Sequence, residues 1–77
     1  MDIESIEVEL QKAFPGSDLS VSNDGSLLQL TILAEQFNDC NRVRRQQMVY
    51  AVIQHRIKSG EVHAVSMHVH APGDKRG

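Results

Sequence analysis

The sequence predicts an α+β fold in which helices cover one face of a three-stranded sheet, with the elements in the order α-β-β-α-(α)-β. Two segments carry apolar residues at helical spacing, and three carry alternating or short continuous apolar runs. A chain of 77 residues is long enough for only one hydrophobic core. We therefore expect a single domain over residues 1–77, ordered over about 1–72 and followed by a short tail at 73–77.

The first element is an amphipathic helix that begins after Asp2, a residue type favoured at helix N-caps. Pro15-Gly16 follows the last apolar position and ends the helix. The apolar residues recur at helical spacing: Ile3, Ile6, Leu10 and Phe14.

Two strands follow as a hairpin. Residues 19–21 and 28–32 alternate between apolar and polar side chains, and Asn23-Asp24-Gly25-Ser26 between them is typical of a turn. We expect the second strand to end near Leu33-Ala34.

A long helix comes next, after a connection over residues 35–39. Asn41 is a candidate N-cap, and Ser59-Gly60 is typical of a helix end. The helix carries an apolar stripe that we expect to face the core: Val43, Tyr50 and Ile57 at a spacing of seven, with Val49 and Ile53 beside them.

Residues 62–69 predict a third strand, which Ala71-Pro72-Gly73 ends. The helical crossover makes this strand a parallel neighbour of the second, so both begin at the same end of the sheet. We therefore expect Leu27 and His63 to lie close together. Cys40 follows the far end of the second strand, roughly 20 Å away, and is expected at the opposite end from His63.

Charge is divided unevenly along the chain. Residues 1–39 hold eight acidic side chains against Lys12 alone, and residues 40–77 hold seven basic ones against two acidic. The basic half also holds all four histidines. Two interpretations remain open: the halves attract each other within the fold, or the basic half binds a partner.

Several classes of protein are excluded or disfavoured by composition. One cysteine cannot form a disulfide within the chain, and no apolar run approaches the ~20 residues of a membrane span. The N-terminus shows no basic stretch before an apolar core, so we expect a cytoplasmic protein. The sequence holds no Ser/His/Asp set, glycine-rich phosphate loop or paired carboxylates, and we do not expect an enzyme.

Two segments carry a family resemblance. Residues 37–50 (FNDCNRVRRQQMVY) and 62–67 (VHAVSM) resemble the BolA family, and within it the small IbaG/YrbA-type bacterial members. The family pattern is F-x-G-x-S-R-V-K/R-R/K-Q-Q-x-V-Y, followed by I-H-A-V-S-I. The resemblance covers roughly residues 1–72 and implies a class II KH-like fold, which agrees with the order of elements predicted above.

The resemblance implies a function in which His63 matches the histidine that BolA proteins contribute to a [2Fe–2S] cluster shared with a monothiol glutaredoxin. Imidazole is an established ligand for such a cluster. The chain departs from the pattern at Leu27, where IbaG-like members place a histidine and other branches a cysteine. We expect attachment through His63 alone, with the glutaredoxin and its glutathione supplying the other ligands. Cys40 corresponds to no family ligand.

Basic residues suggest a second function. Arg42, Arg44 and Arg45 crowd the first turn of the long helix, where cations oppose the helix dipole, and Gln46 follows them. They suit phosphate contacts or a protein partner, so the alternative is a KH-like nucleic-acid-binding regulator of transcription or stress. The preceding loop lacks glycine and carries Asp39, so any such binding is expected to be weak and salt-sensitive.

Two simpler interpretations complete the set. His68 and His70 are two residues apart on one strand and could chelate a divalent metal, but two ligands are too few for a structural site. A homodimeric stress protein without a cofactor is the remaining functional alternative.

Overall fold

The computed structural model describes residues 1–74 and contains two α-helices, three strands and two short 3₁₀ helices. The elements are α1 (Ile3–Ala13), β1 (Asp18–Asp24), β2 (Leu27–Leu33), η1 (Glu35–Phe37), α2 (Arg42–Lys58), β3 (Ala64–His70) and η2 (Pro72–Asp74). The α+β class and the element order are as the sequence predicts. The optional second helix before the last strand is not formed, because α2 runs as one helix from Arg42 to Lys58 and β3 follows it.

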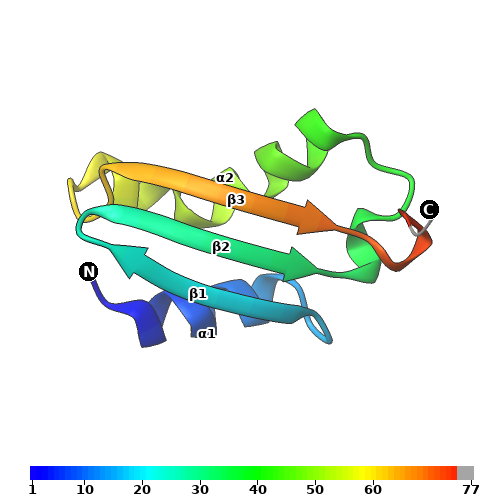
Figure 1. Ribbon diagram of the computed structural model, residues 1–77, viewed down its shortest axis with the longest axis horizontal. Helices are drawn as coiled ribbons and strands as arrows, with labels where there is room; N and C mark the ends of the chain where they lie inside the picture. The colour runs from blue at the N-terminus through cyan, green and yellow to red at the C-terminus, as the bar shows by residue number, and fades with distance from the viewer. Residues whose placement is uncertain (75–77) are drawn as a thin grey trace.

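The sheet has the strand order β1-β2-β3, and both α-helices lie on one of its faces (Figure 1). Strands β1 and β2 are antiparallel, while β2 and β3 are parallel. The parallel register pairs Leu27 with Ala64, so the two strands begin at the same end of the sheet. The other face is open and carries mainly polar side chains from alternate strand positions.

Local signals in the sequence determine where the elements begin. Asp2 caps α1 by accepting a hydrogen bond from the Ser5 backbone N–H at 3.1 Å, and Asn41 caps α2 by accepting from Arg44 at 2.8 Å. In the hairpin turn, Gly25 adopts a φ of 60°, a conformation that glycine accepts without steric cost.

The core lies between the helices and β2, and one prediction about it was wrong. Val43 and Tyr50 of α2 are 61% and 41% exposed, and Ile57 is half-buried. The side of α2 that meets the sheet instead runs through Val49 and Ile53, which are fully buried. A helix can turn only one face toward the sheet, and on α2 that face carries Val49 and Ile53. These two residues belong to a core cluster of buried side chains: Ile6, Leu10, Phe14, Leu28, Leu30, Ile32, Ala34, Phe37, Val49, Ile53, Val62 and Ala71.

The third strand differs from its predicted bounds of 62–69. It begins at Ala64, because Val62 turns into the core and its backbone N–H donates to the Arg56 carbonyl at 3.1 Å. Beyond β3, η2 continues past the expected end of order at 72 and reaches Asp74. Residues 75–77 of the predicted tail lie outside the described residues.

The loop before α2 contains a residue in an unusual backbone conformation. Asp39 has a φ of 68°, in the left-handed region that favours glycine. The resemblance to the family pattern places a glycine at this position, and the geometry supplies the physical reason for it.

Across residues 1–74, no helix combines the length and the apolar character needed to cross a membrane.

Candidate functional site

His63 lies at the end of the sheet where β2 and β3 begin. The strand starts at Ala64, so His63 occupies the preceding loop and lies outside the strand that was predicted over residues 62–69. Its backbone N–H donates to the Ser26 carbonyl at 3.2 Å, which links it to the β1–β2 turn beside Leu27. The expected proximity of Leu27 and His63 is confirmed. The residue is exposed, so it is presented to solvent and to a partner.

The loop that holds His63 is fixed by a buried arginine that sequence reasoning missed. Arg56 is only 9% exposed, and its guanidinium contacts Glu61 at 3.0 Å and Glu9 at 2.9 Å. The third nitrogen donates to the Ser5 hydroxyl at 2.7 Å. Since Glu61 is two residues before His63, this network pins the loop between α2 and β3. The uneven charge of the two halves was the signal in the sequence, because Glu9 and Arg56 come from opposite halves.

Ionisation in this network follows from its contacts. Partial burial acts to raise the pKa of Glu9, but hydrogen bonds and positive charge from Arg56 and His55 outweigh it and lower the pKa below its ordinary value. The pKa of Glu61 is also lowered, mainly by a hydrogen bond from the Asp2 backbone N–H and also by Arg56. Both carboxylates are therefore charged at neutral pH.

The ligands near His63 are too few for a complete metal site in this chain. Within residues 1–74, no group of three or more His, Cys, Asp or Glu side chains is placed to hold a metal ion. Leu27, at the position of the family's loop ligand, has an apolar side chain. A [2Fe–2S] cluster needs four protein or thiol ligands. The site thus fits a shared cluster as the donor of one ligand, and the others must come from another molecule.

Cys40 lies at the other end of the sheet from His63, as predicted, in the loop that follows β2 and η1 (Figure 1). Its sulfur is 3.8 Å from the Gln36 carbonyl and 4.0 Å from the Met48 sulfur. These contacts are those of a half-buried structural thiol. Cys40 and His63 cannot bind the same cluster within one chain.

Arg45, one of the predicted binding residues, is engaged inside the fold. Its guanidinium pairs with Asp74 through two bonds of 2.6 and 2.9 Å, and its Nε donates to the Cys40 carbonyl at 2.8 Å. The hydrogen bond from Arg45, aided by one from the Ala71 backbone, holds the pKa of Asp74 far below its ordinary value. The same bond raises the pKa of Arg45. Arg45 therefore ties η2 to α2.

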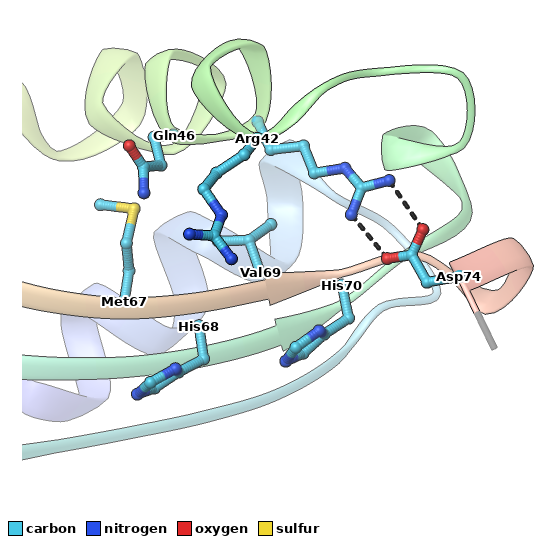
Figure 2. Close-up of a pocket in the computed structure, with 8 residues that line it drawn as sticks. Arg42, Gln46, Met67, His68, Val69, His70 and Asp74 are labelled. Atoms are coloured by element: carbon cyan, nitrogen blue, oxygen red, sulfur yellow. Dashed lines mark hydrogen bonds and ion pairs between the residues drawn. The ribbon is translucent and has the colours of Figure 1, made fainter. Parts of the chain in front are cut away.

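A cleft of about 380 Å³ separates the beginning of α2 from β3 (Figure 2). Its walls come from α2, β3 and η2: Arg42, Arg45, Gln46, Met67, His68, Val69, His70 and Asp74. Arg45 and Asp74, both lining residues, are paired with each other. Figure 2 shows the Arg42 guanidinium over β3. The cleft brings together Arg42, Arg45 and Gln46 of the predicted set, and Arg44 is not among its lining residues.

The charges in this cleft are only partly satisfied. None of the ion pairs within residues 1–74 involves Arg42, whereas Arg45 is neutralised by Asp74. His68 and His70 are both exposed and lie on the same side of β3, as their spacing predicted. The two imidazoles project from the side of β3 opposite to Met67 and Val69, away from the Arg42 guanidinium (Figure 2). The cleft can therefore attract an anionic group through Arg42.

Comparisons with known proteins agree on one family. The family model described as BolA-like protein matches residues 3–74. The chain is 40% identical over 67 residues to a protein from the rpoN-murA intergenic region of Acinetobacter guillouiae, covering 87% of this chain and 81% of that one. It is 32% identical over 74 residues to the acid stress protein IbaG of Escherichia coli, covering 96% and 88%.

The solved structures agree in fold. The BolA domain of SufE1 from Arabidopsis thaliana superposes with a TM-score of 0.84 at 23% identity, covering 94% of this chain and 93% of that one.

Proposed function

The chain belongs to the BolA-like family, and from this premise we propose that it is an adaptor that binds a monothiol glutaredoxin and contributes His63 to a shared [2Fe–2S] cluster. One observation carries the proposal: His63 is exposed at the end of the sheet while its backbone is held by Ser26. An exposed imidazole on a backbone held in this way can approach an iron atom on a partner without rearrangement of the fold.

The surroundings of His63 support the role of a single donor. The residue before it, Val62, is fully buried, and Glu61 is held by Arg56, so the loop cannot move away from the sheet without breaking these contacts. A pre-positioned ligand loses little conformational entropy on binding. A histidine in place of a thiolate raises the reduction potential of a [2Fe–2S] centre.

Leu27 makes this chain a weaker donor than a relative that carries a second loop ligand. Its side chain is half-buried beside the His63 loop and offers no nitrogen, oxygen or sulfur atom. The chain alone is therefore expected to bind no cluster, and attachment should depend on the glutaredoxin. A small domain can act by supplying one ligand while a partner supplies the others. The occurrence of a BolA domain within SufE1 supports a function in combination with other protein domains.

The first experiment compares two histidines of the same region. A monothiol glutaredoxin is reconstituted with a [2Fe–2S] cluster and mixed with the wild-type chain, with His63→Ala or with His68→Ala, and visible absorption and circular dichroism are recorded. We expect the wild type and His68→Ala to produce the same changed spectrum. With His63→Ala, the spectrum should remain identical to that of the glutaredoxin measured without the chain. Identical spectra for His63→Ala and the wild type would contradict the proposal.

A gain-of-ligand variant sharpens the same test. Leu27→His places a second imidazole next to the His63 loop, since Leu27 pairs with Ala64. We expect this variant to retain the cluster longer than the wild type during titration with a chelator. Leu27→Met, of similar size and apolar character, serves as the control and should behave like the wild type.

A role in acid stress is part of the proposal. The Escherichia coli relative is named an acid stress protein, and it matches nearly the whole chain. Growth of a deletion strain at mildly acidic pH, with and without the His63→Ala chain, tests whether the ligand and the stress role are linked.

The cleft beside β3 supports a second candidate function, the binding of nucleic acid as a regulator. Arg42 is available there, with His68 and His70 nearby, but Arg45 is already paired with Asp74. Fluorescence polarisation with a short oligonucleotide at several salt concentrations tests it. A steep salt slope that falls in Arg42→Ala and not in Lys12→Ala would support this function. No binding at low salt would exclude it.

A further inference from the structure

One side of α2 carries an apolar stripe of which the fold uses only one end, where Ile57 packs against the core cluster. Val43 and Tyr50 are exposed and Ile57 is half-buried, and the three recur every seven residues. We call this surface the outer stripe of α2, made of Val43, Gln47, Tyr50, Ala51, Gln54 and Ile57. Part of it forms an open groove around Tyr50 and Ile57.

The spacing of the outer stripe is that of a helix that contacts another helix. Side chains seven residues apart align on one side over two turns of an α-helix, which is the arrangement found at helix–helix seams. Val49 and Ile53 face the sheet, and of the three apolar residues only Ile57 packs against the core, while Val43 and Tyr50 stay exposed. The groove around Tyr50 and Ile57 is largely apolar, and an exposed apolar patch on a small domain is characteristic of an interaction site.

Charge on α2 limits what can bind there. The helix holds five Lys and Arg residues and no acidic one. Arg45 and Arg56 are paired within the fold. The remaining three, Arg42, Arg44 and Lys58, take part in no ion pair within residues 1–74. The outer stripe is therefore uncharged along its length and positive at both ends.

A second copy of the chain is a poor occupant. If two α2 helices packed antiparallel about Tyr50, the end of the stripe that carries Arg44 in one copy would lie opposite the end that carries Lys58 in the other, because these residues are six and eight positions from Tyr50. If the helices packed parallel, each cation would meet its own equivalent. Like charges directly opposed at a helix–helix seam are unfavourable in both arrangements.

We propose that the outer stripe of α2 binds an amphipathic helix of a partner protein, with apolar side chains at a spacing of seven and acidic residues near both of its ends. The apolar residues cover Val43, Tyr50 and Ile57, and the acidic residues pair with Arg44 at one end and Lys58 at the other. This surface belongs to the helix layer, and it does not involve His63. The proposal therefore stands independently of the cluster-binding function.

The test uses two synthetic peptides of about 18 residues, long enough for three leucines at a spacing of seven. One carries glutamates near both ends, and the other carries lysines at the same positions. Binding is measured by fluorescence anisotropy and mapped by amide chemical shifts on the isotope-labelled full chain. We expect the acidic peptide to bind at least about tenfold more tightly, with shifts along α2. Equal affinities, or shifts confined to other elements, would overturn the proposal.

Variants separate this surface from the rest of the molecule. Val43→Ser combined with Tyr50→Ser should weaken binding of the acidic peptide at least about tenfold. Val8→Ser removes another exposed valine, 53% exposed and on α1, and should leave binding unchanged, as should His63→Ala. Circular dichroism confirms that each variant is folded. If light scattering shows a wild-type dimer that Tyr50→Ser abolishes, the occupant is a second copy and the proposed partner is wrong.

Discussion

The two faces of α2 have similar apolar side chains and opposite fates. The inner face places Val49 and Ile53 in the core together with the buried Arg56, while the outer face leaves Val43 and Tyr50 in solvent. Amphipathic spacing shows that a helix has an apolar side, but here the helix has two. Only one of the two sides packs against the sheet. The side with the more regular apolar repeat therefore need not be the side that is buried in the core.

The inner face is notable for including a charge. Arg56 can be buried because α1 and the loop after α2 bring Glu9 and Glu61 to its guanidinium, and Ser5 accepts a further hydrogen bond. Buried cations are tolerated when they are paired and hydrogen-bonded in this way. The inner face is therefore built from contacts with several elements, whereas the outer face contributes only Ile57 to the packing around the core.

The largest effect should come from the inner face. Ile53→Ala removes a fully buried side chain between α2 and the sheet, and we expect a loss of about 3 kcal/mol in the free energy of unfolding. Urea denaturation followed by circular dichroism measures it. Ile57→Ala, at a half-buried position of the outer stripe, is the matched control and should cost less than about 1.5 kcal/mol. Equal losses at the two positions would break the comparison of the two faces.

The next effect tests the charge on the inner face. Arg56→Met keeps most of the side-chain volume but leaves Glu9 and Glu61 without their partner, and we expect a loss of about 2 kcal/mol. The control is Lys58→Met, at an exposed position two residues further along the same helix, and its effect on the free energy of unfolding should be nearly zero.

Acid should reduce the difference between Arg56→Met and the wild type. The pKa values of Glu9 and Glu61 are lowered in the folded wild type, so their pairing stabilises it above the unfolded-state pKa near 4.5. That contribution is lost as pH falls through the lowered values. The gap between the two unfolding curves should thus be full at pH 7 and shrink below about pH 4.5. A gap that is constant with pH would mean that Arg56 acts only through packing.

Much of the fold could be predicted because its determinants are local. The caps at Asp2 and Asn41, and the turn around Gly25, each act over a few residues. The parallel register that places Leu27 near His63 followed from the order of elements. The start of β3 could not be read in this way, since it depends on Val62 turning into a core assembled from distant segments.

In the candidate site, too, positions that the topology determines could be predicted, and pairings between distant residues could not. His63 and the distant Cys40 were placed correctly at opposite ends of the sheet, because topology determines both positions. The pairing of Arg45 with Asp74 was not predicted, since the two residues are 29 positions apart and share no periodic pattern. Nor could the sequence show that Arg42 would remain available beside β3 while Arg45, in the same helical turn, is neutralised.

The smallest effect is the most informative about the outer face. Val43→Ser changes an exposed side chain that packs against no core residue, and valine and serine have similar helix propensities. We expect a change within about 0.5 kcal/mol in the free energy of unfolding, measured by the same urea titration. A loss comparable to that of Ile53→Ala would show that Val43 supports the fold. A neutral result leaves the seven-residue repeat without a role inside the molecule, so that its function must be sought in contact with another helix.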